Sequence, residues 1–290
     1  MKVLELKNVK KNYLSFQLDV NFALSSGETI GLVGKNGAGK TTIINIILNI
    51  VKKDSGIVEI FGQDHILQED RVKERMGVVL EDHYFYKNFK IDDILNFASS
   101  LYSNWDIEYS MHLRQKFGLN ENKKYKELSK GMKVKLSTII ALSHKADLLI
   151  FDEPTSGLDP KVRNDLLEEI LDIKRKRNST MLFASHNMKD IEMLSDRIIM
   201  IDEGKIILDE KKKELNEKWR LVKFYCKDEI DFSSFSTVRV MQSNNNYHTL
   251  LLTQGDIKIL KMLNKIGVIE LTHSHVSMEE AFLILEGNRT

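Results

Sequence analysis

The nine residues from Gly34 to Thr42, GKNGAGKTT, constrain this chain more than any other stretch. They form a glycine-rich loop that ends in lysine and threonine, between an apolar run (29–33) and a helical pattern (42–51). In this context the glycines let backbone N–H groups turn toward phosphate oxygens, and the helix begins with its positive end facing them. Lys40 is expected to reach the β- and γ-phosphates, and the Thr41 hydroxyl to bind Mg²⁺. The stretch therefore predicts a phosphate cradle.

A pair of acidic residues follows a second apolar run. Residues 148–151 read as a strand buried on both faces of a parallel sheet, and Asp152 and Glu153 come directly after it. We expect Asp152 to hold Mg²⁺, directly or through water, and Glu153 to lie near the γ-phosphate and polarise an attacking water. Two acids at a strand end are also common in ordinary loops, but their position after the glycine-rich loop favours the functional interpretation.

The overall composition excludes several classes of protein. The chain has 290 residues, and its 43 basic and 42 acidic residues give a formal net charge of +1. A nucleic-acid-binding face needs a concentration of basic residues, so no nucleic-acid partner is expected. The single cysteine, Cys226, suits a reducing cytosol. The sequence shows neither an apolar signal core nor the roughly 20 apolar residues of a membrane span.

Hydropathy patterns divide the chain into segments. Two runs between residues 2 and 24 alternate apolar and polar residues, as antiparallel strands with one solvated face do. The pattern from 91 to 119 is helical, and it lies between segments that alternate strands and helices. We expect an α/β main domain over 1–210, with an antiparallel β subdomain and a helical subdomain at about 84–145. A helical linker over 211–218 and a small α+β accessory domain over 219–290 would follow.

Three further motifs lie at specific positions. LSKGM (128–132) opens a predicted helix with Ser129 as its N-cap, SGLD (156–159) follows the acidic pair, and His186 follows the apolar run 180–184. With GKNGAGKTT and LLIFDE (148–153), they resemble the signature loop, D-loop, switch histidine, Walker A loop and Walker B strand of ATP-binding cassette (ABC) transporter subunits. The resemblance implies a P-loop nucleotide-binding cassette that hydrolyses ATP with Mg²⁺.

The same resemblance implies roles for the matching residues. Lys40, Glu153 and His186 would be catalytic, and His186 would hold the γ-phosphate and the attacking water in place. Thr41, Asp152 and Glu81 would be the metal ligands. The residues implied to contact ATP are Tyr13, which would stack on adenine, and Gly34, Asn36, Gly37, Ala38, Gly39, Lys40, Thr41, Thr42, Ser129, Gly131 and Asp159. Ser129 would act on ATP bound to a second cassette, so that two ATP molecules lie between two head-to-tail subunits, identical or different.

Three positions depart from the family pattern. Lys130 stands at the first glycine of the signature, Met132 replaces its glutamine, and Glu81 stands where the family usually has glutamine. Glu81 can accept hydrogen bonds or bind a cation, but it cannot donate an amide N–H at neutral pH. The departures leave open a regulatory cassette that does not hydrolyse ATP. The presence of Lys40, Glu153 and His186 favours an active ATPase.

The absence of a spanning segment implies a separate multi-span membrane permease, with this chain at the cytoplasmic face of the cell membrane. Aromatic residues at 83–86 and 89 fall where the family grips a helix of that permease. We expect Tyr84 and Tyr86 to contribute to docking, although a place in the core of the helical insert fits them equally well.

The LSKGM motif, Glu81 and the tail (268–285) together resemble bacterial exporters of antimicrobial or cytolytic peptides. Export of peptides or other amphipathic substrates is therefore the expected function. An importer ATPase is one alternative, and a non-transport ATPase that acts on the ribosome or on DNA is another. The single cassette and the short distance from Lys40 to Ser129 argue against the second alternative.

Overall fold

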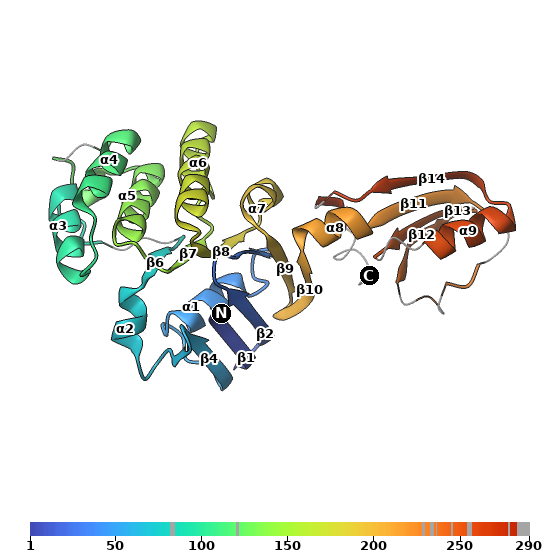
Figure 1. Cartoon of the computed structure of the whole chain (residues 1–290), viewed down its shortest axis with the longest axis horizontal. Helices are drawn as coiled ribbons and strands as arrows, with labels where there is room; N and C mark the ends of the chain where they lie inside the picture. Colours follow the sequence, from blue (N-terminus) through green and yellow to red (C-terminus); the bar gives the residue numbers. More distant parts are fainter. Residues whose placement is uncertain are drawn as a thin grey trace. The chain divides into compact units, whose positions relative to one another are not determined.

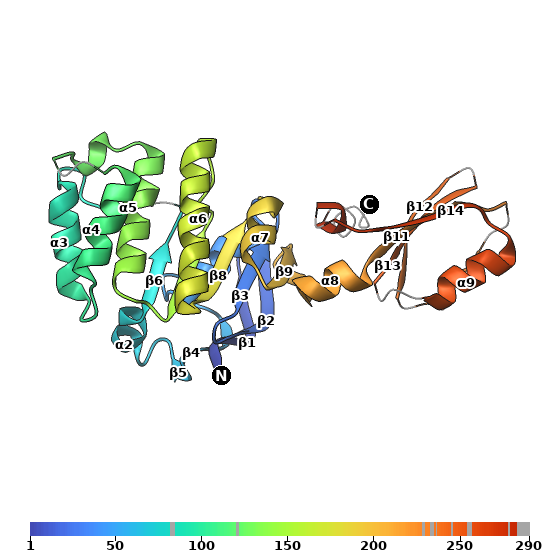
Figure 2. The same cartoon turned by 45° about the horizontal axis from the view of Figure 1, so that its top comes forward.

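The computed structural model describes residues 1–81, 85–119, 122–227, 230–232, 235, 237–244, 246–253, 257–277 and 279–282 (Figure 1, Figure 2). The chain forms two compact units, Met1–Asp209 and Glu210–Thr290. The stretch expected as a linker is the helix α8 (Lys212–Lys218), and the structure groups this helix with the second unit. Each unit has a hydrophobic cluster of its own.

The first unit is built on one sheet, which within the described residues has the strand order β5-β4-β1-β2-β10-β9-β3-β8-β7-β6. The strands are β1 (Lys2–Asn12), β2 (Gln17–Ser25), β3 (Thr29–Val33), β4 (Ser55–Ile60), β5 (Gln63–Asp64), β6 (Met76–Val79), β7 (Leu148–Asp152), β8 (Thr180–Ser185), β9 (Arg197–Asp202) and β10 (Lys205–Lys211). Strands β9, β3, β8, β7 and β6 run parallel, whereas β2, β1 and β4 are antiparallel. Strand β10 pairs with β2 at Lys205 and Asp19, so the expected antiparallel part continues the parallel sheet.

The helices of the first unit connect these strands. They are α1 (Lys40–Ile47), α2 (Glu69–Glu74), α3 (Ile91–Leu101), α4 (Ile107–Phe117), α5 (Lys130–Ser143), α6 (Pro160–Arg177) and α7 (Met188–Leu194). Helix α5 packs against β6, and α3 and α4 pack against α5 in both views, within the range expected for the helical subdomain (Figure 1, Figure 2). His83 and Tyr84 lie outside the described residues. Among the residues that are described, no helix is both long enough and apolar enough to cross a membrane.

Helix α1 lies in the main hydrophobic core. Its sequence is rich in isoleucine and threonine, which are weaker helix formers than alanine or leucine, so its own propensity favours it little. Ile43 and Ile44 are fully buried in one cluster with Leu6 of β1 and Ile150 of β7. Burying a side chain of this size contributes about 1.5–3 kcal/mol. Tertiary packing therefore holds this helix, and the loop before it, against the sheet.

Helices α5 and α6 begin at side-chain caps. The Ser129 hydroxyl accepts a hydrogen bond from Met132 N at 3.3 Å, which confirms the predicted cap. Asp159 Oδ1 accepts one from Val162 N at 3.0 Å, and Pro160 occupies the first helical position, where its missing N–H costs nothing. The motifs LSKGM and SGLD are therefore both helix starts.

The second unit is a small antiparallel sheet with a helix against it, as the sequence predicts. Its strands are β11 (Arg220–Tyr225), β12 (Val238–Asn244), β13 (Tyr247–Leu252) and β14 (Ile269–His275), in the order β12-β13-β11-β14. Ile259 and Leu263 of α9 (Ile257–Ile266) are buried in one cluster with Val222 and Phe224 of β11. Residues 279–282 are helical, and Ser277 Oγ accepts a hydrogen bond from Glu280 N at 3.1 Å.

Candidate functional site

The glycine-rich loop connects the carboxyl end of β3 to the first turn of α1. Gly39, the residue before α1, has a φ of 114°, which glycine adopts without strain, and a Cβ there would lie 2.8 Å from Phe16 Cζ. Ala38 O accepts a hydrogen bond from Gly204 N at 3.0 Å. Asn36 and Gly37 are exposed at the tip of the loop. The base of the loop is therefore held by the fold, while its tip is open to a ligand.

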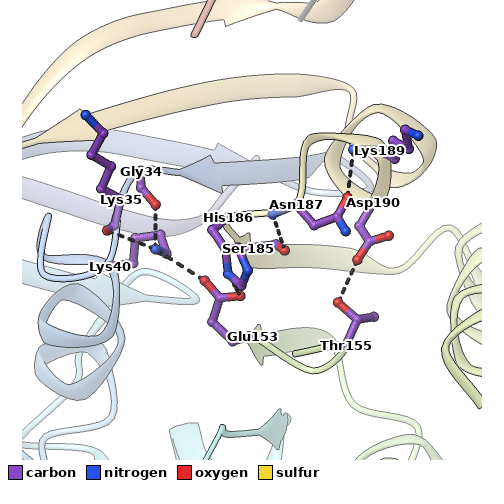
Figure 3. Close-up of polar contacts among 10 residues, drawn as sticks. All are labelled: Gly34, Lys35, Lys40, Glu153, Thr155, Ser185, His186, Asn187, Lys189 and Asp190. Atoms are coloured by element: carbon purple, nitrogen blue, oxygen red, sulfur yellow. Dashed lines mark hydrogen bonds and ion pairs between the residues drawn. The ribbon is translucent and has the colours of Figure 1, made fainter. Parts of the chain in front are cut away.

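Lys40, Glu153 and His186 form a chain of contacts at this edge of the sheet (Figure 3). Lys40 Nζ donates to Gly34 O at 2.7 Å and to Lys35 O at 3.2 Å. It also lies 3.2 Å from Glu153 Oε1, an ion pair without hydrogen-bond geometry. Glu153 Oε2 lies 2.7 Å from His186 Nδ1. The carboxylate is thus placed between a buried cation and a half-exposed imidazole.

The backbone of Glu153 adopts an uncommon conformation. Its φ of 48° is in the left-handed region, which costs a residue with a side chain about 1–3 kcal/mol. A hydrogen bond from Glu153 N to Ala184 O, at 2.9 Å, holds the residue against the end of β8. Because His186 follows β8 by one residue, the same strand end positions both partners of the contact.

Asp152 lies beside Thr41 at the start of α1. Burial raises the pKa of Asp152 to about 6; the hydrogen bond from Thr41 opposes this rise, and the nearby carboxylates of Glu153 and Glu81 add to it. Asp152 Oδ1 is buried and has no hydrogen-bond partner. A carboxylate and a hydroxyl are oxygen donors of the kind that Mg²⁺ prefers.

The donor set fits a magnesium ion that takes further ligands from a bound nucleotide. Among the described residues, no group of three or more His, Cys, Asp or Glu side chains could hold a metal ion by itself. Mg²⁺ in nucleotide sites is commonly bound by one or two carboxylates together with substrate phosphates. Glu81, the third expected ligand, is exposed just after β6.

Ser129, Gly131 and Asp159 lie at the starts of α5 and α6, which face each other. A Cβ on Gly131 would lie 3.2 Å from Val162 Cγ1, and Lys130 Nζ lies 3.4 Å from the place of a Cβ on Gly157. Lys130 therefore lies along the SGLD loop. In the described part of the chain, no hydrogen bond or ion pair joins Ser129 or Asp159 to loop 34–42.

Tyr13 lies next to Phe16, which packs against the glycine-rich loop. Tyr13 N donates to Phe16 O at 2.7 Å, and the two ring centroids are 6.2 Å apart. Phe16 packs against Gly39, while the Tyr13 side chain is 47% exposed and available for stacking. Further along, Tyr86 is 76% exposed and its ring lies 5.0 Å from that of Phe89.

Sequence reasoning missed several residues that support the site. Phe16 and Gly204 hold the glycine-rich loop, as described above. Asp190 is fully buried, four residues after His186, and is bound by Thr155 and Arg163. No local pattern singled out Asp190, because its segment 188–194 also carries the charged residues Lys189 and Glu192. No local pattern indicated Gly204 beyond the turn itself.

Three comparisons place the chain among known proteins. The profile of the family described as ABC transporter matches residues 18–156. The ABC transporter ATP-binding protein YtrB of Bacillus subtilis (strain 168) is 27% identical over 300 residues, which cover 99% of this chain and 99% of that protein. The bacitracin transport ATP-binding protein BcrA of Bacillus licheniformis is 30% identical over 289 residues, or 93% of this chain and 92% of that protein. A solved ATP binding subunit of an ABC transporter aligns with a TM-score of 0.68 and 26% identity, over 74% of this chain and 92% of that chain.

Proposed function

This chain belongs to the ATP-binding proteins of ABC transporters and hydrolyses ATP for transport, and from that premise we propose that it drives export of a peptide or another amphipathic substrate through a separate multi-span permease. The likeness to a protein named for bacitracin transport supports transport of a peptide. This likeness extends over 93% of the chain and so includes part of the second unit. On this proposal the chain lies at the cytoplasmic face of the membrane, bound to the permease.

The observation that carries the site assignment is the placement of the Glu153 carboxylate between Lys40 and His186. In the proposed reaction Lys40 leaves Glu153 to bind the β- and γ-phosphates of ATP. Glu153 then accepts a proton from the attacking water, and His186 orients that water and the γ-phosphate. The loop N–H groups between Gly34 and Thr42 and the start of α1 surround the phosphates, and Tyr13 stacks on the adenine.

We propose that Thr41 and Asp152 hold Mg²⁺, with Glu81 nearby. When bound, the ion neutralises phosphate charge as the γ-phosphoryl group is transferred. The buried Asp152 oxygen without a hydrogen-bond partner supports this assignment, since an unpaired buried oxygen is costly unless a ligand completes it. Glu81 stands where the family usually has glutamine. Its carboxylate can accept hydrogen bonds, but it lacks the N–H groups that a glutamine amide would donate.

Ser129, Gly131 and Asp159 are proposed to serve the ATP of a second cassette, identical or different, in a head-to-tail dimer. Within the described residues, Ser129 and Asp159 make no hydrogen bond to loop 34–42 of the same chain, and their side chains cap helix starts, which suits a role in trans. The proposed domains are a cassette over 1–210 with a helical part at about 84–145, a linker over 211–218 and an accessory domain over 219–290. Exposed Tyr86 is the described candidate for permease docking, since Tyr84 lies outside the described residues.

Inside-out membrane vesicles that contain this chain and its permease test the proposal. With ATP and Mg²⁺, wild-type vesicles should accumulate the peptide in their lumen, which corresponds to export. Glu153→Gln should still bind ATP, but its turnover should fall by about 10²–10⁴-fold, because the proton acceptor is lost. Glu168→Gln, a matched change at an exposed position of α6, should leave transport and hydrolysis unchanged.

Two results would contradict the proposal. ATP-dependent loss of preloaded peptide from the lumen would indicate an importer instead of an exporter. Wild-type turnover in Glu153→Gln would remove this residue from the catalytic role.

A further inference from the structure

Asp190 is a buried carboxylate for which the proposed mechanism has no use. Its side chain is fully inaccessible to solvent, at 0% exposure. Thr155 Oγ1 donates a hydrogen bond to Asp190 Oδ2 at 2.6 Å (Figure 3). Arg163 binds the other carboxylate oxygen, with Nε at 3.0 Å and Nη2 in a second, short contact. A buried charge is stable only when it is paired and hydrogen bonded, and both conditions are met here.

The Thr155 contact leads to the proposed general base. Thr155 lies two residues after Glu153, separated from it only by Pro154, and its side chain is buried. Ser156 N donates to Glu153 O at 3.1 Å, so residues 153–156 form a tight turn. Fixing the Thr155 side chain therefore fixes one end of the turn whose other end is the left-handed Glu153 backbone.

The helix that carries Asp190 leads to the proposed orienting histidine. Asp190 lies in the first turn of α7, and its N–H donates to Asn187 O at 3.2 Å. The Asn187 side chain accepts from Lys189 N at 3.1 Å, while Asn187 N donates to Ser185 Oγ at 3.0 Å. His186 is therefore held between the end of β8 and a capped helix start that Asp190 ties down (Figure 3).

The Arg163 contact leads to the SGLD loop. Arg163 lies in the first turn of α6, and its N–H donates to Asp159 O at 3.0 Å. Helices α6 and α7 lie side by side in both overall views (Figure 1, Figure 2). One carboxylate thus joins the segment after Glu153, the segment after His186 and the segment that begins at Asp159.

We infer that Asp190 is a positioning residue for ATP hydrolysis, which holds Glu153 and His186 in register through Thr155 and α7 and ties both to the Asp159 loop through Arg163. The inference rests on the proposed roles of Glu153 and His186. Asp190 touches none of the reacting groups. Its effect is on geometry, and small displacements of catalytic groups are costly because catalysis depends on their alignment. It should therefore change kcat and leave ATP binding intact.

Thr155→Val tests this inference, because it removes one donor and keeps the Asp190–Arg163 ion pair. In the full-length protein we expect kcat to fall roughly ten- to hundredfold, with KM for ATP unchanged. Thr155→Ser returns the hydroxyl and should restore kcat. Thr138→Val is the matched control, since Thr138 is also fully buried and donates to Val134 O at 2.9 Å within α5. It should keep wild-type kcat. Each variant is compared at a temperature where circular dichroism shows it to be folded.

Three outcomes would overturn the inference: wild-type kcat in Thr155→Val, a loss that Thr155→Ser does not restore, or an equal loss in Thr138→Val. Glu153→Gln, measured in parallel, separates this result from the proposed function. If Glu153→Gln loses turnover while Thr155→Val keeps it, the positioning role alone fails. If Glu153→Gln keeps turnover, the assigned role of Glu153 fails first.

Discussion

Burial determines what single residues of this site can do. Lys40 and Glu153 are 5% and 6% exposed, and their ion pair occupies the place where phosphate is proposed to bind. The attraction between opposite charges is stronger in such a poorly solvated place than in water. A bound nucleotide must therefore replace the Glu153 carboxylate as the partner of Lys40. This replacement frees Glu153 to contact the attacking water. The same burial leaves an oxygen of Asp152 without a protein partner.

His65 offers a test of burial away from the site. Its ring is 3% exposed, with Nδ1 3.1 Å from Val58 O, and burial lowers the pKa of His65 below the ordinary value of 6.5. Between its folded-state pKa and 6.5, the unfolded chain binds more protons than the folded one. The free energy of unfolding should therefore be fully retained above pH 6.5 and should fall as the pH drops below it.

In the variant His65→Asn the amide can still donate to Val58 O. The free energy of unfolding of this variant should depend less steeply on pH, by at most the slope that one bound proton contributes. Urea unfolding followed at pH 7.5 and 5.5 gives the comparison, with His112→Asn, at an exposed position, as the control. His144 is also buried with a lowered pKa and keeps its contribution in both variants. An identical pH dependence in His65→Asn and the wild type would exclude His65 as its source.

Among the elements, the β9–β10 hairpin does more than connect two strands. Glu203 and Gly204 have φ values of 44° and 77°, which suit a tight hairpin turn. Gly204 N donates to Ala38 O at 3.0 Å, and Gly204 O accepts from Asp19 N at 2.8 Å. The turn therefore holds the glycine-rich loop on one side and strand β2 on the other. The glycine in DEG (202–204) is typical of a hairpin turn, but only the packed sheet shows what the turn touches.

Gly204→Ala should weaken both stability and ATP binding. An added Cβ would lie 2.0 Å from Gln17 O, so backbone must move, in addition to the strain of the positive φ. Gly62→Ala is the matched control, because Gly62 has a φ of 73° and open space around it. Its cost should be limited to about 1–2 kcal/mol of backbone strain, with ATP affinity unchanged. Calorimetry and nucleotide titration would measure both, and equal effects of the two variants would contradict a supporting role for the turn.

At the scale of the whole molecule, the chain consists of two units with separate cores. The solved ABC transporter subunit covers 74% of this chain, whereas the relatives YtrB and BcrA match it over 99% and 93%. The first unit carries every residue of the candidate ATP site, from Tyr13 to His186. The second unit is shared with the full-length relatives and supplies none of those residues.

The separate cores predict separate responses to nucleotide. ATP at one hundred times its Kd should stabilise the first unit by about 2.7 kcal/mol, since it binds only the folded cassette. Hydrogen exchange followed by mass spectrometry should then show slower exchange in peptides from 1–209. On addition of ATP, hydrogen exchange in peptides from 210–290 should change little in the wild type. In the Lys40→Ala variant it should not change. Equal slowing of both units in the wild type would show that they open as one cooperative body.

The sequence by itself determined the order of elements and the identity of the chemical groups. GKNGAGKTT, the acids after 148–151 and the predicted Ser129 cap depend on local backbone demands, namely glycine conformations, strand ends and helix starts. Such demands are written within a few residues, so they can be read without the fold. The α+β content of the second unit was predictable for the same reason, because strand-like and helix-like runs can each be recognised within a few residues.

Tertiary structure decided which groups meet. No local pattern states that Gly204 binds Ala38, that Phe16 packs under Gly39, or that the continuous sheet runs through β10 into β2. The same holds for Asp190, whose partners Thr155 and Arg163 come from two other segments. These contacts join residues far apart in the chain, and their stability comes from exclusion of water after the core has formed. Local sequence specifies the reactive groups of this protein, whereas packing at long range sets the distances between them.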